Sequence, residues 1–239
     1  MVSPFGARGG NGGIQDADNL GWKLAAVLTG KAPPALIESY DRERVYAADE
    51  NLKHSSRATA FMTPKSTAEA ELRDAVLALA AKAPFARRLV NSGRLSTPAR
   101  LEGALFSEGA AAVLPVGSPA VDAPVAENGT MVSFLDVLIR HPDAFHLVTI
   151  GEEMRGLSLD GVCVIHIGAF HEAGPLKASA LFEARYGQSG AYLLRPDQHV
   201  AAHFAEPHRA AVERAYAKAL AWPAGVPTGA APTPSGVPA

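Results

Sequence analysis

A chain of 239 residues, 48% of them hydrophobic and 19% charged, can bury a core and form one large domain or two small ones. The formal net charge of −2 gives no reason to expect nucleic acid or an anionic membrane as a partner. We find no signal-peptide pattern, no apolar run of about 18 residues and only one cysteine, so we expect a cytoplasmic protein without internal disulfides.

The N-terminal stretch combines glycines with a helical pattern. The sequence begins MVSPFGARGGNGG, and a helix is predicted from Gly12 to about Thr29, with Asn11 as its N-cap. Gly30 is expected to end this helix. Spacings of three and four predict one apolar face, which consists of Ile14, Ala17, Leu20, Leu24 and Leu28. Because Trp22 and neighbouring alanines widen this surface, we expect the helix to pack on more than one side.

A second, longer helix is predicted in the segment APPALIESYDRERVYAADENLKHSSRATAFM, where Pro33 and Pro34 mark the start. The predicted core face consists of Leu36, Ile37, Tyr40 and Ala48. The charged residues that follow are interpreted as a solvated or locally paired face; they are Asp41, Arg42, Glu43 and Arg44. Two shorter helices are predicted at residues 67–82 and 85–93.

The composition changes near Leu105, where the chain becomes rich in Gly, Pro, Ala and Val and contains turn residues. We interpret this segment as a linker and the entry into a second domain. The expected organisation is therefore a first domain at 1–104, a second domain at 105–221 and a disordered Pro/Gly/Ala tail at 222–239.

The second domain is predicted to mix helices and strands. SFLDVLIRH and PHRAAVERAYAKALA indicate helices, and FHLVTIG and VCVIHIG are compact β-rich runs, which is typical of buried strands. AYLLRPDQHVAAHF predicts a β-hairpin with the turn at residues 195–198, Arg-Pro-Asp-Gln. Cys163 lies within one of these runs and is interpreted as a small buried hydrophobe rather than a nucleophile.

Three histidines near the C-terminal end of this domain raise a metal hypothesis. They are His199, His203 and His208, and their spacing crosses a predicted strand and a helix start. Metal-binding pairs such as H-E-x-x-H lie on one face of one helix instead. We therefore predict no metal site.

Glycine-rich stretches before a helix can bind phosphate, but this one lacks the two common phosphate-binding patterns. GARGGNGG has no G-K-[ST] and therefore no lysine for a β- or γ-phosphate. It also lacks the G-x-G-x-x-G spacing, and no strand precedes it. Both generic nucleotide-binding interpretations are weak.

The segment PFGARGGNGGIQDADNLGWKLAAVLTG, followed by SYDRER, closely resembles the class A flavin-dependent aromatic hydroxylases, a family that includes p-hydroxybenzoate hydroxylase and phenol hydroxylase. Every fixed position of the family pattern P-x-G-x-x-G-x-N-x-G-x-x-D-A-x-N-L-x-W-K-L is met. The second half, through LPVGSPAVDAPV and ARYGQSGAYLLRPDQHVAAHF, is similar to the thioredoxin-like C-terminal domain of the phenol-hydroxylase and polyketide-hydroxylase branches. The resemblance implies an α/β fold, in which the helical end of an FAD-binding domain precedes a thioredoxin-like α/β domain.

The resemblance also implies cofactors and a site. FAD would be the bound cofactor, NADPH its reductant, and an aromatic small molecule, a phenol or an aromatic polyketide, the substrate. Backbone amides of Gly9, Gly10 and Asn11 would approach the pyrimidine side of the isoalloxazine, where the helix dipole favours negative charge. Pro4 and Gly6 would shape the turn beside the reacting edge of the flavin. We assign no catalytic residue in this chain.

The family's G-x-G-x-x-G unit, its Asp-Gly motif and its Gly-Asp motif are absent from this sequence. We therefore interpret the chain as a C-terminal fragment of such an enzyme, incomplete and inactive alone. Its expected partners are the missing N-terminal FAD-binding half or a second copy in a homodimer. An alternative interpretation remains open, in which the chain is a non-catalytic thioredoxin-like module for interaction or dimerisation.

Overall fold

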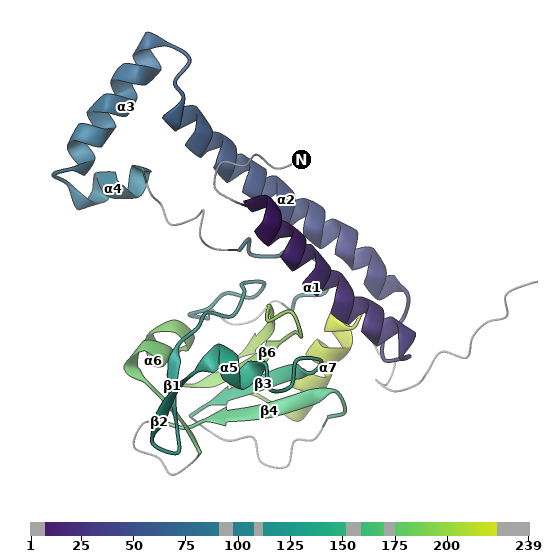
Figure 1. Cartoon of the computed structure of the whole chain (residues 1–239). Coiled ribbons are helices and arrows are strands. Elements are labelled where there is room, and N and C mark those ends of the chain that lie inside the picture. Colours follow the sequence, from purple (N-terminus) through teal and green to yellow (C-terminus); the bar gives the residue numbers. More distant parts are fainter. Residues whose placement is uncertain (1–7, 91–97, 108–111, 152–158, 170–174, 224–239) are drawn as a thin grey trace, which may run out of the picture. The chain divides into compact units, whose positions relative to one another are not determined.

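The structure is a computed structural model that describes residues 8–90, 98–107, 112–151, 159–169 and 175–223 (Figure 1). Side chains are described from residue 10 onward and are omitted again at residues 88–90. Most of the tail that we predict to be disordered, residues 224–239, lies outside the described residues. The mixed helix and strand content confirms the α/β class.

The chain divides into two compact units, and each is discontinuous in sequence. One consists of residues 1–17 and 44–99, and the other consists of residues 18–43 and 100–239. Helices α1 (Arg8–Leu28) and α2 (Ala35–Met62) therefore each contribute residues to both units.

The described part of the first unit is helical and confirms the predicted helices as far as it extends; residues 91–93 of the helix predicted at 85–93 lie outside the described residues. It contains the beginning of α1 and the later turns of α2, followed by α3 (Thr67–Ala80) and α4 (Pro84–Val90). Ser66 is the N-cap of α3, and its hydroxyl accepts a hydrogen bond of 3.2 Å from the backbone N–H of Glu69. At the other end of α3, the Nε of Arg87 donates to the carbonyl of Ala80 at 3.0 Å. This arrangement ties α4 to the C-terminal end of α3.

Helix α1 ends as predicted at a left-handed glycine. Gly30 has a φ of +73°, and its N–H donates to the carbonyl of Val27 at 3.0 Å. The N–H of Lys31 donates to the carbonyl of Ala26 at 2.8 Å. These two bonds form a Schellman motif, which satisfies carbonyl groups at the helix end.

The buried face of α1 differs from the predicted apolar stripe. Ile14, Leu24 and Leu28 are 71%, 39% and 83% exposed, whereas Asn19 and Lys23 are buried. Within the described residues these three apolar side chains therefore have no cover, although the helix is predicted to pack on more than one side. Asn19 and Lys23 occupy the buried positions because charged side chains there form hydrogen bonds with them, as described below.

The second unit contains two sheets. Its small antiparallel sheet has the order β2-β1-β5, formed by β1 (Pro124–Glu127), β2 (Thr130–Ser133) and β5 (Leu176–Ala178). Asn128 and Gly129 connect β1 to β2 with φ values of 49° and 87°, as a type I′ hairpin turn requires. Part of the segment interpreted as a linker and domain entry therefore forms an ordered hairpin.

The larger sheet confirms both predicted strands and the predicted hairpin. Its order is β4-β3-β6-β7, formed by β3 (Phe145–Ile150), β4 (Val162–Ile167), β6 (Gly190–Leu194) and β7 (Val200–Phe204). Strands β3 and β4 are parallel, and the pairs β3–β6 and β6–β7 are antiparallel. The turn between β6 and β7 lies at the predicted residues, where the N–H of Gln198 donates to the carbonyl of Arg195 at 2.8 Å.

Side chains alternate between the two faces of this sheet, so each face has its own apolar core. One core includes Val148 and Tyr192 and is covered by α5 (Phe134–Leu138) and α6 (Ala180–Tyr186). The other core includes Leu147 and is covered by α7 (Arg209–Ala219) (Figure 1).

Residues of α1 and α2 join this second core. Leu36 is fully buried in it, and the ring of Trp22 meets the edge of Phe145 with centroids 5.7 Å apart. The prediction that Leu36 is a core residue is confirmed, and Trp22 is partly buried against the same core. Because residues 18–43 pack on the sheet, their charged side chains also reach the β6–β7 turn.

Candidate functional site

The residues expected to contact a flavin lie at the start of α1. Pro4 and Gly6 lie outside the described residues, whereas Gly9, Gly10 and Asn11 form part of the first turns of the helix. The predicted N-cap is wrong, because α1 begins at Arg8 and Asn11 is already helical. Glycines disfavour a helix only by about 1 kcal/mol each, so packing of the later turns can extend it through them.

The glycines of this segment have no steric role within the described chain. A Cβ atom placed on Gly10, Gly12 or Gly13 would meet no atom within 4 Å. Their φ angles are not in the left-handed region either. Since glycine in a helix costs stability relative to alanine, packing inside this chain does not explain why three glycines occur here. Their small size is suited to a group that approaches from outside the described residues.

The first turn of α1 can donate hydrogen bonds to such a group. The first N–H groups of any α-helix lack a partner within the helix, and here they include those of Gly9 and Gly10. No acidic side chain lies in the first turn to compete for them. The positive end of the helix dipole adds an attraction for negative charge, worth about 0.3–1 kcal/mol when exposed.

A pair of charged side chains lies two turns further along within the same unit. The Nε of Arg44, on α2, donates to a carboxylate oxygen of Asp16, on α1. Arg44 is only 8% exposed, and its partner lies 28 residues away in the sequence on another helix. The interpretation of Arg44 as part of a solvated or locally paired face is therefore wrong. The pair joins α1 to α2 beside the glycine segment.

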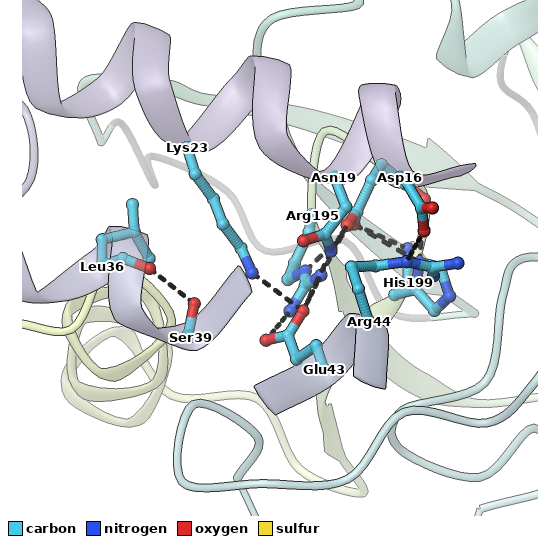
Figure 2. A network of polar contacts seen from close by, with 10 residues as sticks. Asp16, Asn19, Lys23, Leu36, Ser39, Glu43, Arg44, Arg195 and His199 are labelled. Atoms are coloured by element: carbon cyan, nitrogen blue, oxygen red, sulfur yellow. Dashed lines mark hydrogen bonds and ion pairs between the residues drawn. The ribbon is translucent and has the colours of Figure 1, made fainter. Parts of the chain in front are cut away.

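The second unit contains a buried cluster of charged side chains that the sequence analysis did not identify. We call it the charge cluster, and it consists of Asn19, Lys23, Glu43, Arg195 and Asp197 (Figure 2). Lys23 and Arg195 are fully buried, and Glu43 is 3% exposed. Two cations thus face two anions inside the protein, and Asn19 bridges the anions.

Glu43 is the centre of the charge cluster. Its two carboxylate oxygens accept hydrogen bonds of 2.9 Å from Nη1 and Nη2 of Arg195, which is the bidentate geometry of a strong pair. Lys23 Nζ donates to Oε2 of Glu43 at 2.9 Å. Asn19 Nδ2 donates to the same Oε2 at 2.9 Å and to Asp197 Oδ2 at 2.8 Å.

Arg195 is held on its other sides by Asp197 and by aromatic rings. Its Nε donates to Oδ1 of Asp197 at 3.0 Å, two residues further along the β6–β7 turn. The guanidinium carbon lies 5.2 Å from the ring centroid of Trp22 and 5.0 Å from that of Phe106. Arg195 is therefore enclosed by two carboxylates and two aromatic faces, which offset the cost of burying its charge.

The electrostatics of the charge cluster keep both carboxylates ionised. Burial acts to raise the pKa of Glu43 and of Asp197. The charge of Arg195, together with the neighbouring charges and the hydrogen bonds to each carboxylate, outweighs burial and leaves both pKa values below their ordinary range. Burial lowers the pKa of Lys23 to about 8, although Glu43 opposes this change. At neutral pH the cluster thus carries two positive and two negative charges.

Two of the histidines considered for a metal site can be placed in the structure as follows. The Nδ1 of His199 lies 3.0 Å from the backbone oxygen of Asp197, at the edge of the charge cluster, and His208 is the N-cap residue of α7. Within the described residues, no three His, Cys, Asp or Glu side chains are grouped as metal ligands would be.

Cys163 lies half-buried in β4, where burial raises the pKa of its thiol.

Sequence reasoning missed the charge cluster because its members are far apart along the chain. Glu43 and Arg195 are separated by 152 residues, and no local pattern links them. Asn19 and Lys23 did belong to the fixed positions of the motif, and their spacing of four places them on one helix face. Polar residues fixed within an otherwise apolar helix were the available signal.

No helix in the described part of the chain is long and apolar enough to cross a membrane.

Comparisons with known proteins agree with the motif at the N-terminal end. The FAD binding domain family matches residues 1–55. A 3-(3-hydroxy-phenyl)propionate/3-hydroxycinnamic acid hydroxylase of Mycolicibacterium gilvum (strain PYR-GCK) is 36% identical over 138 residues, which are 57% of this chain and 24% of that protein. A hydroxylase of the same name from Klebsiella pneumoniae is 35% identical over 133 residues, 55% of this chain and 24% of that protein. The match thus spans about a quarter of the length of these relatives.

Solved structures share the fold over most of this chain. The flavin-dependent monooxygenase PieE, in complex with FAD and substrate, has a TM-score of 0.70 and 24% identity, and the match covers 93% of this chain and 46% of that one. The Diels-Alderase PyrE3 has a TM-score of 0.60 and 26% identity, covering 91% of this chain and 39% of that one. Residues 1–55 therefore match the FAD-binding domain family, and the resemblance of this chain to the class A flavin-dependent aromatic hydroxylases is confirmed.

Proposed function

We propose that this chain forms part of an FAD-dependent, NAD(P)H-using monooxygenase that hydroxylates an aromatic substrate. The match of residues 1–55 to the FAD-binding domain family carries the proposal. The aromatic hydroxylases among its relatives support the reaction, and a phenol or aromatic polyketide is the substrate class we assign. The fold alone would not decide this, because a Diels-Alderase has a similar fold.

In this proposal, Gly9, Gly10 and Asn11 contact the flavin through their backbone amides, and Pro4 and Gly6 shape the turn before them. The support is the open space around Gly10, together with the unpaired amides expected in the first turn of α1. FAD would supply the redox chemistry, while this segment orients the ring and polarises it. No side chain of this chain is assigned a catalytic role.

The second domain is proposed to be thioredoxin-like. The order β4-β3-β6-β7, with one parallel pair beside two antiparallel pairs and a closing helix α7, supports this assignment. The single cysteine of the sequence rules out a C-x-x-C pair and therefore thiol–disulfide exchange within this domain. The domain limits 1–104, 105–221 and 222–239 remain predictions, as does a cytoplasmic location.

Binding of FAD to the purified chain tests the proposed function. Because relatives that match this chain are about four times longer than the matched region, we expect weak, reversible binding that desalting removes. Flavin fluorescence titration would measure it, with Gly10→Val as the variant expected to lose it. A chain that stays yellow after desalting would contradict the idea that most of the FAD contacts lie elsewhere. Equal affinity of Gly10→Val would contradict the assigned site.

A second candidate function is a non-catalytic module for interaction or dimerisation. It is favoured by the two apolar cores on either face of the larger sheet, the second of which also includes Leu36 of α2. Light scattering on the full chain over a range of concentrations would test it. A chain that stays monomeric at every concentration would count against this candidate.

A further inference from the structure

The glycine segment at the start of α1 is not held by apolar packing. Within the described side chains, no residue from Gly10 to Asp18 is buried. A Cβ atom on Gly10, Gly12 or Gly13 would also meet nothing within 4 Å. Because glycine loses more conformational freedom on folding than any other residue, a helix end with several glycines and no packing opens easily. The segment therefore needs another attachment if its backbone is to keep one conformation.

A polar attachment lies directly after the glycines. Asp16 is about one and a half turns beyond Asn11, and its carboxylate accepts a hydrogen bond from the Nε of Arg44 (Figure 2). The Nη2 of Arg44 lies 3.5 Å from the Oε1 of Gln15, the neighbouring residue of α1. All three of these side chains belong to the same compact unit. Arg44 thus ties the first turns of α1 to α2.

The two members of the ion pair differ in exposure, and this difference makes Arg44 the anchor. Arg44 is 8% exposed, whereas the side chain of Asp16 is 44% exposed. A buried guanidinium needs its hydrogen-bond partner, since a buried charge without one is far more costly than a charge in water. Arg44 therefore favours conformations in which Asp16, and with it the preceding turns of α1, stays in place.

We propose that Arg44 is a positioning residue for the flavin contact at the start of α1. By holding Asp16, it keeps the first turn helical, so that the amides of Gly9 and Gly10 point out of the helix end toward a bound ring. This inference rests on the proposed function, in which these amides contact FAD. In this role Arg44 does not touch the ring. It raises the population of the conformation that binds FAD, and the apparent affinity follows that population.

Amide hydrogen exchange in the full ¹⁵N-labelled chain tests the attachment without FAD. The N–H groups of Gly12 and Gly13 donate to carbonyls of the first turn of α1, so their protection reports whether that turn is helical. Arg44→Gln should lower this protection at least about threefold, while amides near Leu24 keep theirs. The matched control is Arg42→Gln, because Arg42 is exposed on the same helix and this variant removes the same charge. Equal protection in the two variants would overturn the proposal.

A double-variant cycle tests whether Arg44 acts through Asp16. Arg44→Gln and Asp16→Asn should each weaken FAD binding about threefold to tenfold in a flavin fluorescence titration. Because both changes break the same attachment, the double variant should bind no more weakly than the weaker single variant. Arg44→Lys should recover part of the affinity, since it keeps the charge but not the planar fork. Effects that add in the double variant would contradict action through Asp16.

Failure of this inference and failure of the proposed function give different results. If FAD shifts the amide signals of Gly9 and Gly10 in the wild-type chain but Arg44→Gln binds FAD as tightly, only the positioning role is overturned. If FAD leaves these signals of the wild-type chain unchanged, the flavin contact itself is overturned, and with it the role of Arg44 in flavin binding.

Discussion

Replacing Glu43 with glutamine should destabilise the second unit strongly. The carboxylate accepts hydrogen bonds from Arg195, Lys23 and Asn19, and all of these groups are buried. The neutral amide would leave Lys23 without a counter-charge and Arg195 with Asp197 alone. Removing one member of a buried ion pair costs about 3–5 kcal/mol, because the remaining charge stays desolvated. We expect Glu43→Gln to lower the free energy of unfolding by this amount.

Urea unfolding, followed by tryptophan fluorescence, measures this loss. For a urea dependence of about 2 kcal/mol per molar, the midpoint should fall by about 2 M. Glu38→Gln is the matched control, because Glu38 is exposed on the same helix and should change stability by no more than about 0.5 kcal/mol. Equal midpoints for the two variants would refute the reasoning that the charge cluster holds this unit together.

Two further predictions concern other buried positions. Burial lowers the pKa of His146 from 6.5 to about 4. Between these pH values the unfolded state therefore binds more protons than the folded state. The free energy of unfolding should fall by up to about 3 kcal/mol as the pH drops from 6.5 to 4. His146→Leu should lack this part of the acid loss in pH-dependent unfolding, and an unchanged pH profile would contradict it. Gly117→Ala should destabilise the protein severely, because Gly117 has a φ of +85° and a Cβ there would lie 1.9 Å from the carbonyl oxygen of Leu101. Gly129→Ala is the matched control, because Gly129 has a φ of +87° but open space around it, so this variant carries the backbone strain without the clash. Thermal unfolding should show a clearly smaller loss of stability for Gly129→Ala than for Gly117→Ala.

The elements predicted from local patterns are those that the structure confirms. Helix periodicity identified α2 and α7, and Gly30 was recognised as a helix end because only the left-handed conformation closes a Schellman motif. The hairpin at Arg195 was readable from its turn residues. In each case the information lies within a few residues of the chain.

Other features depend on contacts that no local pattern contains. The charged run that contains Glu43 was interpreted as a solvated or locally paired face. A local charge pattern cannot predict the partner of Glu43, because the guanidinium of Arg195 lies 152 residues further along the chain. The apolar stripe with Ile14 and Leu28 was correctly identified as apolar but is exposed, since apolar periodicity does not say what covers a face. The dipeptide Asn128-Gly129 is typical of a hairpin turn and could have been predicted from the sequence. It was overlooked because the surrounding segment was interpreted from its composition alone.

The most direct test of the central claim is an NMR titration of the ¹⁵N-labelled chain with FAD. We predict that FAD shifts the amide signals of Gly9, Gly10 and Asn11 selectively, while those of the turn glycines Gly103 and Gly129 stay in place. Loss of these shifts in Gly10→Val would show that the ring approaches this backbone. If FAD leaves the first turn of α1 unchanged, or shifts only signals elsewhere, the account of the glycine segment as a flavin contact is contradicted.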